Sequence, residues 1–118
     1  MDSNYQLSRT DVLDHFKNTD FVLKTQQQIL KDFEISGSEF HPVLRNTPFS
    51  YEDLTEIISE MLSVVLQKGE RQTLQLLYQI DIPQSQFLSN TTGPNFLLKT
   101  SQLIITREAQ KVYLRSIL

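Results

Sequence analysis

Two histidines and no cysteine are available for metal binding or nucleophilic catalysis in this chain of 118 residues. Without cysteine, a disulfide, a thiolate zinc site, an iron-sulfur cluster and a cysteine nucleophile are all excluded. His15 follows Asp11 by four residues, a spacing that brings two ligands together on a helix, but a zinc site needs three or four. A serine triad would need His15 or His41 to meet a nucleophile without the G-x-S-x-G motif, which the sequence lacks. We therefore predict no metal site and no catalytic residue.

The glycines and the paired carboxylates also argue against catalysis. Gly37, Gly69 and Gly93 are too far apart to form either glycine-rich phosphate-binding motif, so we expect no nucleotide and no other cofactor. Glu56 and Glu60 are one helical turn apart, as acid and base pairs can be, but they lie on the polar side of a predicted helix and face solvent. The sequence favours a protein without enzymatic activity.

Residues 36–49 form the one segment whose composition suggests a small-ligand site. The segment lacks helical periodicity and contains two prolines, each of which disfavours helix at the residue before it. His41 is preceded by Phe40 and followed by Arg45, and a histidine and an arginine rimmed by an aromatic ring could bind an anion. The alternative is a loop whose apolar side chains only cover the core. Those apolar side chains are Phe40, Val43, Leu44 and Phe49.

The last predicted helix, residues 95–116, is apolar on two sides. One side carries a stripe for the core, and the other carries two leucines beside basic residues, a mixture typical of binding surfaces. A helix with two apolar sides is either the central helix of its bundle or contributes its second side to a homodimer. The core stripe is Leu98, Ile105, Ala109 and Val112, and the predicted interaction surface is Leu103, Arg107, Lys111, Leu114 and Arg115.

Nucleic-acid binding is the alternative from another functional class. Two predicted helices meet at Gly69 as in a helix-turn-helix, and the second begins with polar side chains able to read base edges. The charge disfavours this function, because the chain has a net charge of −3 and Glu70 lies at the same helix start. The polar side chains are Arg71, Gln72, Thr73 and Gln75.

Charge is distributed unevenly along the chain. Residues 1–66 hold 11 acidic and 5 basic side chains, net −6, and residues 67–118 hold 3 acidic and 6 basic ones, net +3. This asymmetry indicates either acidic and basic helices that face each other within one bundle, or two oppositely charged faces suited to assembly.

Capping residues and apolar spacing predict the elements that position these side chains. Ser8 with Asp11 starts a short helix, and Ser50 with Asp53 starts the helix with the clearest apolar stripe, which Gly69 ends. The segment 70–80 fits a helix or a strand, and we choose helix because the sequence offers no second strand to pair with it. The remaining predicted helices are 19–33, 83–88 and 95–116.

We therefore predict a single all-α domain over residues 1–118, a bundle of five to six helices with one long ordered loop. The sequence has no signal peptide and no apolar run near the roughly 20 residues of a membrane span, so we expect a cytoplasmic protein. Its expected function is a non-enzymatic protein-protein interaction module that binds a partner or a second copy through a helical surface. A helix-turn-helix-like nucleic-acid-binding regulator and small-ligand binding near 36–49 are the alternatives.

Overall fold

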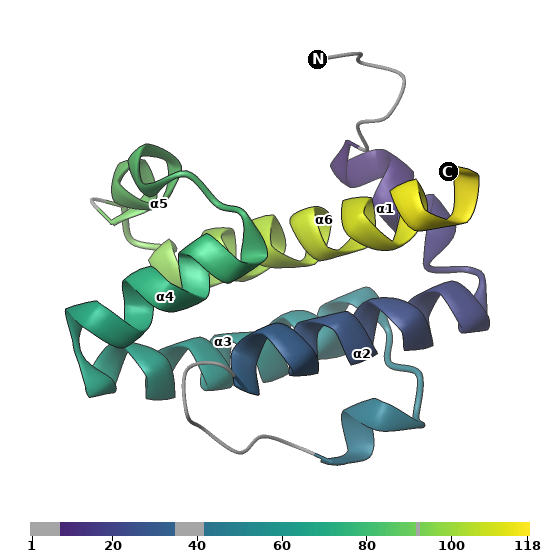
Figure 1. Ribbon diagram of the computed structural model, residues 1–118, viewed down its shortest axis with the longest axis horizontal. Helices are drawn as coiled ribbons and strands as arrows, with labels where there is room; N and C mark the ends of the chain where they lie inside the picture. The colour runs from purple at the N-terminus through teal and green to yellow at the C-terminus, as the bar shows by residue number, and fades with distance from the viewer. Residues whose placement is uncertain (1–7, 35–41, 92) are drawn as a thin grey trace.

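The computed structural model describes residues 8–34, 42–91 and 93–118 (Figure 1). These residues form helices joined by short turns and contain no strand, so the predicted all-α fold is confirmed, including the helix at 70–80. No described helix combines the length and the apolar character needed to cross a bilayer. The elements are α1 (Arg9–His15), α2 (Thr19–Glu34), the 3-10 helix η2 (Pro42–Arg45), α3 (Tyr51–Lys68), α4 (Glu70–Ile80), α5 (Gln84–Asn90) and α6 (Phe96–Ile117).

Helix boundaries follow the predicted capping residues. The Ser8 hydroxyl accepts a hydrogen bond from the Asp11 N–H at 3.2 Å, and Asp11 Oδ2 accepts one from the Ser8 N–H at 2.9 Å, which completes a capping box. Ser50 caps α3 by accepting from the Asp53 N–H at 3.1 Å. Gly69 separates α3 from α4 at a φ of 112°, a conformation that strains residues with a side chain. Local chemistry therefore fixes where these helices start and stop.

α6 is the central helix of the bundle. It runs above α2 and α3 in Figure 1, with α4 and α5 toward its N-terminal end and α1 toward its C-terminal end. It packs against each of the helices α1 to α5. The structure thus bears out the interpretation that neighbours within the chain cover both sides of this helix, whereas the homodimer stays a prediction.

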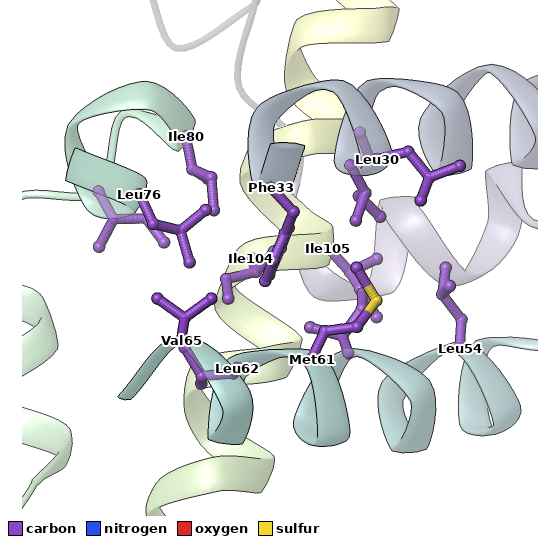
Figure 2. Close-up of a cluster of buried hydrophobic side chains, with 14 of the residues drawn as sticks. Leu30, Phe33, Leu54, Met61, Leu62, Val65, Leu76, Ile80, Ile104 and Ile105 are labelled. Carbon is purple, nitrogen blue, oxygen red and sulfur yellow. The ribbon is translucent and has the colours of Figure 1, made fainter. Parts of the chain in front are cut away.

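The hydrophobic core lies where α2, α3, α4 and α6 meet (Figure 2). Val65 of α3 and Leu76 and Ile80 of α4 point toward one another, and Phe33 extends from α2 toward α6. All four side chains are fully buried. Each contributes about 1.5–3 kcal/mol relative to an exposed position.

The core covers only part of the first turn of α6: Phe96 packs against it, but the leucines that follow do not. Leu98, predicted for the core stripe, is 46% exposed, so that prediction was wrong. Leu98 projects from the same side of α6 as Ile105 and Ala109, which are both fully buried. The neighbouring helices that cover those two residues do not cover Leu98. Leu97 beside it is also exposed.

Gln26, a buried amide in α2, fixes the segment 44–49, which begins within η2. Its Nε2 donates to the backbone oxygens of Leu44 at 3.0 Å and Thr47 at 2.8 Å, and its Oε1 accepts from the Phe49 N–H at 2.9 Å. Leu44 is buried and Phe49 packs against the core, as predicted. One neutral side chain therefore satisfies three backbone groups of the same segment.

Candidate functional site

Two acidic side chains and a lysine meet inside the bundle. Asp32 of α2 and Glu108 of α6 are both 0% exposed, and Lys111, one turn after Glu108, is 24% exposed. Lys111 Nζ lies 2.7 Å from Asp32 Oδ2 and 3.0 Å from Glu108 Oε1. We call Asp32, Glu108 and Lys111 the buried ionic cluster.

Amide groups from two helices complete the surroundings of this cluster. Gln28 Nε2 donates to Asp32 Oδ1 at 3.0 Å, and Gln79 Nε2 of α4 lies 3.4 Å from the same oxygen. Lys111 Nζ also donates to the backbone oxygen of Gln79 at 2.7 Å. Since buried charges are costly unless paired and hydrogen-bonded, these contacts tie α2, α4 and α6 together.

The two carboxyl groups have opposite pKa shifts. Burial, with Asp32 beside it, raises the pKa of Glu108 to about 9, although Lys111 acts in the other direction. Burial also acts to raise the pKa of Asp32, but hydrogen bonds with Glu108, Lys111 and Gln28 outweigh burial and lower it. At neutral pH Glu108 is therefore protonated and Asp32 ionised.

Protonation explains the hydrogen bonding of Glu108. Neither of its carboxyl oxygens accepts a hydrogen bond of good geometry among the described residues, which would be costly for a buried carboxylate. A neutral carboxyl group avoids leaving a buried charge without a hydrogen bond. The contact with Lys111 is then an ammonium beside a neutral carboxyl, and the ion pair of the cluster is Lys111 with Asp32.

Paired carboxyl groups with separated pKa values can serve as a general acid and base. Here both carboxyl groups are fully buried, so no substrate reaches them in this conformation. The buried ionic cluster is therefore an internal tie between helices.

The basic residues of the predicted interaction surface face other parts of the chain. Lys111 belongs to the buried ionic cluster. Arg107 Nε donates to the backbone oxygen of Asp81 at 2.9 Å, and its Nη2 lies 3.1 Å from Asp81 Oδ2. Arg115, which is exposed, donates through Nη1 to Gln28 Oε1. An α6 lysine thus pairs with an α2 aspartate, as expected where acidic and basic helices face each other.

The two leucines of that predicted surface, Leu103 and Leu114, are both half-buried. Leu103 packs against the core cluster. All five residues of the predicted interaction surface therefore lie on α6, and other parts of the chain partly cover its two leucines. Their role as an interaction surface stays a prediction.

Two of the three residues predicted for the ligand loop, Phe40 and His41, lie outside the described residues, as does the side chain of Val43. Arg45, its third predicted member, pairs with Glu34 at 3.1 Å, and both side chains are largely exposed. Anion binding by this loop stays a prediction.

The α3–α4 elbow places the predicted base-reading residues at different depths. Thr73 is buried and its hydroxyl donates to the Gly69 oxygen at 2.9 Å, so it faces the fold. Gln72 is half-buried, and Arg71 and Gln75 are exposed. Among the described residues, no group of three or more potential metal ligands is clustered. His15 instead packs its ring against Phe21 and Tyr113.

A groove lies between the α3–α4 elbow and α5, and exposed leucines lie on its wall and on the neighbouring start of α6. The groove has a volume of about 290 Å³. Leu88 on its wall is 52% exposed, and Leu97 and Leu98 of α6 are 36% and 46% exposed. Leu88 and Leu97 directly follow Phe87 and Phe96, whose rings lie 5.5 Å apart, so all belong to one corner. The α5 corner is defined as Leu66, Leu74, Phe87, Leu88, Leu97 and Leu98.

A larger cleft, of about 580 Å³, lies between the α1–α2 corner and the C-terminal half of α6. We call it the His15 cleft. Residues that line it include His15, Phe21, Lys24, Gln27, Tyr113 and Arg115.

No protein-family model, no curated protein sequence and no solved structure matches this chain.

Neither the buried ionic cluster nor the role of Gln26 was predicted from the sequence. Glu108 follows Ile104 and precedes Val112 by four residues, so an acid within the apolar spacing of α6 was a usable signal. The burial of Asp32 was harder to predict, because this residue lies at the edge of the apolar stripe of α2. Whether a residue at that edge is buried depends on how the neighbouring helix packs. The pairing of Asp32 with Lys111 across 79 positions has no sequence signature.

Proposed function

We propose that this protein is a non-enzymatic interaction module that binds an acidic amphipathic helix of a partner protein at the α5 corner. The observation that carries this proposal is the exposure of Leu88, Leu97 and Leu98 beside the apolar groove. Exposed apolar side chains gathered at one place on a folded protein are typical of a binding surface. A groove of this kind fits a helix that offers apolar side chains at three- and four-residue spacing.

The charges near this corner favour an acidic partner. Lys68 and Arg71 flank the elbow, and Lys99 follows Leu98 on α6; all three are exposed and make no ion pair among the described residues. Glu70, at the start of α4, is also exposed and lines the groove itself, so the three cations lie around the groove and outnumber this one acid. Because Arg107 and Lys111 are already paired with aspartates, the excess positive charge of residues 67–118 lies largely around the α5 corner. An acidic helix complements it.

The α5 corner also suits binding better than the outer side of α6 predicted from the sequence. A binding surface needs apolar anchors that solvent still reaches. Leu103 and Leu114 are half-buried, whereas Leu88 and Leu98 are exposed.

Binding of designed peptides tests the proposal. The probe is a fluorescein-labelled helical peptide of roughly five turns, with leucines at i, i+4 and i+7 and glutamates elsewhere. Its controls are a scrambled peptide and one with lysines in place of the glutamates. Fluorescence anisotropy should show each control binding at least about tenfold more weakly. Equal binding of the three peptides, or no binding at roughly 1 mM, contradicts the proposal.

Variants locate the binding surface. Leu88→Asp and Leu98→Asp should each weaken binding of the acidic peptide at least about tenfold, because a carboxylate enters an apolar and cation-rich contact. Leu13→Asp is the matched control, since Leu13 is a similarly exposed leucine (39%) on α1, and it should leave binding unchanged. If sedimentation shows a dimer that Leu88→Asp dissociates, a second copy occupies the corner and the proposed partner is wrong.

A further inference from the structure

The His15 cleft lies apart from the α5 corner, and its lining combines features that the proposed function does not use. Its walls come from the α1–α2 corner and from the C-terminal half of α6. Its volume of about 580 Å³ falls within the range of roughly 300–1,000 Å³ found for small-molecule sites. The cleft is therefore large enough for a small ligand.

Three aromatic rings form one wall of this cleft. The His15 ring stacks on Phe21 with centroids 4.9 Å apart and planes inclined by 28°, and it lies 5.5 Å from the ring of Tyr113. Rings in contact hold one another in place, so the wall is preorganised. A flat aromatic ligand can add to such a wall by stacking or by an edge contact.

The cleft also contains an arginine without an acidic partner. Arg115 makes no ion pair among the described residues, and its recorded hydrogen bond uses only Nη1. Its remaining N–H groups can form the two parallel hydrogen bonds that a carboxylate accepts. Lys24, the other cation of the lining, pairs with Asp20 at 3.1 Å, so the net excess charge of the lining comes from Arg115.

A chain of hydrogen bonds positions this arginine. Arg115 donates to Gln28 Oε1, and Gln28 Nε2 donates to the buried Asp32 carboxylate at 3.0 Å. Gln28 is itself buried, so one edge of the guanidinium is held from inside the fold. The opposite edge is left for a ligand.

We infer that the His15 cleft binds a small aromatic carboxylate, with its ring against Phe21 and Tyr113 and its carboxylate on Arg115. The ring alone would leave the free donors of Arg115 unused, and the carboxylate alone would leave the aromatic wall exposed to water. Only a ligand with both groups satisfies both features. This site is independent of the α5 corner, so either proposal can fail without the other.

Titration of the ¹⁵N-labelled protein with benzoate tests the inference by amide chemical shifts. Acetate and benzyl alcohol are the matched probes, because each keeps one of the two ligand groups. Benzoate should shift the amides of Phe21, Tyr113 and Arg115 and should bind at least about tenfold more tightly than either probe. No shift at roughly 10 mM benzoate, or shifts that map to α4 and α5, overturns the inference. Equal binding of acetate and benzoate overturns it as well, because the site would then be unselective for aromatic anions.

Two variants separate the contributions of charge and ring. Arg115→Gln and Tyr113→Leu should each weaken benzoate binding at least about tenfold, with an unchanged circular dichroism spectrum. Arg71→Gln is the control, since Arg71 is an exposed and unpaired arginine on α4, and it should bind benzoate as the wild type does. A folded Arg115→Gln protein that retains wild-type affinity contradicts the assigned role of the arginine.

Discussion

Gln26 and Asp32 are two buried polar residues of the same helix, and their partners differ in kind. Gln26 is neutral and binds three backbone groups of one neighbouring segment. Asp32 is ionised, and its partners are side chains from its own helix and from α4 and α6. One of these side chains, Glu108, is itself titratable. Both side chains are fully buried, so burial alone does not distinguish them.

The difference separates a local attachment from a long-range one. An amide does not titrate, so the Gln26 contacts hold the 44–49 segment at any moderate pH. The buried ionic cluster joins helices far apart in sequence, and its protonation state changes with pH. We therefore expect α2 to contain one attachment that is insensitive to pH and one that is sensitive.

Lys111→Met should have the largest effect on stability. The change leaves the buried Asp32 carboxylate without its ion-pair partner, and breaking a buried pair in this way typically lowers the free energy of unfolding by about 3–5 kcal/mol. Urea denaturation measures it. Lys99→Met, at an exposed and unpaired lysine of the same helix, is the control and should change stability by no more than about 0.5 kcal/mol. Equal effects of the two changes would mean that Lys111 contributes nothing as a partner of Asp32.

Gln26→Ala should cost about 2–3 kcal/mol, because two carbonyl groups and one N–H lose their partner and water reaches them only in part. The loss should be the same at pH 5 and pH 8, since no titratable group is involved. Hydrogen exchange should rise first at the Phe49 amide, which donates to Gln26. A loss that varies with pH would remove the distinction between the two attachments.

Glu108→Gln should change how stability depends on pH. In the unfolded chain Glu108 ionises near its ordinary pKa of 4.5, whereas the folded protein keeps its proton up to a pKa of about 9. Between these values folding takes up a proton, so the free energy of unfolding of the wild type falls as pH rises, by up to about 1.4 kcal/mol per pH unit. The lowered pKa of Asp32 contributes stability that is fully present above its ordinary pKa of 3.8 and is lost as the pH falls below that value, so it does not change the slope between pH 5 and pH 8.

Subtracting the variant from the wild type isolates Glu108, since the two proteins share every other side chain. Between pH 5 and pH 8 the stability of Glu108→Gln should therefore rise steadily relative to that of the wild type. Urea denaturation at each pH measures this difference. Parallel curves for the two proteins would show that Glu108 is ionised in the folded state.

Arg45→Gln should have the smallest effect. The Arg45 and Glu34 side chains are 65% and 53% exposed, and exposed ion pairs contribute less than about 1 kcal/mol. The melting temperature should stay close to that of the wild type. A large drop would show that the ion pair, and not Gln26, holds this segment to α2.

Much of the fold could be predicted because its signals are local. Ser8, Ser50 and Gly69 mark helix ends through hydrogen bonds and backbone preferences within one turn, and the structure places the helix ends there. The stripe of α3 points to the core for the same reason, since its spacing alone fixes a common face.

The candidate sites could not be predicted because they depend on how helices pack. Leu98 projects from the core-facing side of α6, but no neighbouring helix covers it. A helical wheel gives the direction of a side chain and not the extent of the neighbouring helices. Lys111 was assigned to an outer surface, and the structure places its ammonium against Asp32. The His15 cleft forms only where α1, α2 and α6 meet, so its lining residues are scattered through the sequence.

The central position of α6 has a consequence for how the chain folds during synthesis. The ribosome releases residues 8–91 before α6, yet the helices within that stretch share α6 as their common neighbour. Until residues 96–117 emerge, Ile29 and Phe33 lack part of their apolar cover, and the nascent chain presents a binding site for chaperones. The core therefore cannot be completed before residues 96–117 have emerged, and we expect the helices to fold together and not one by one.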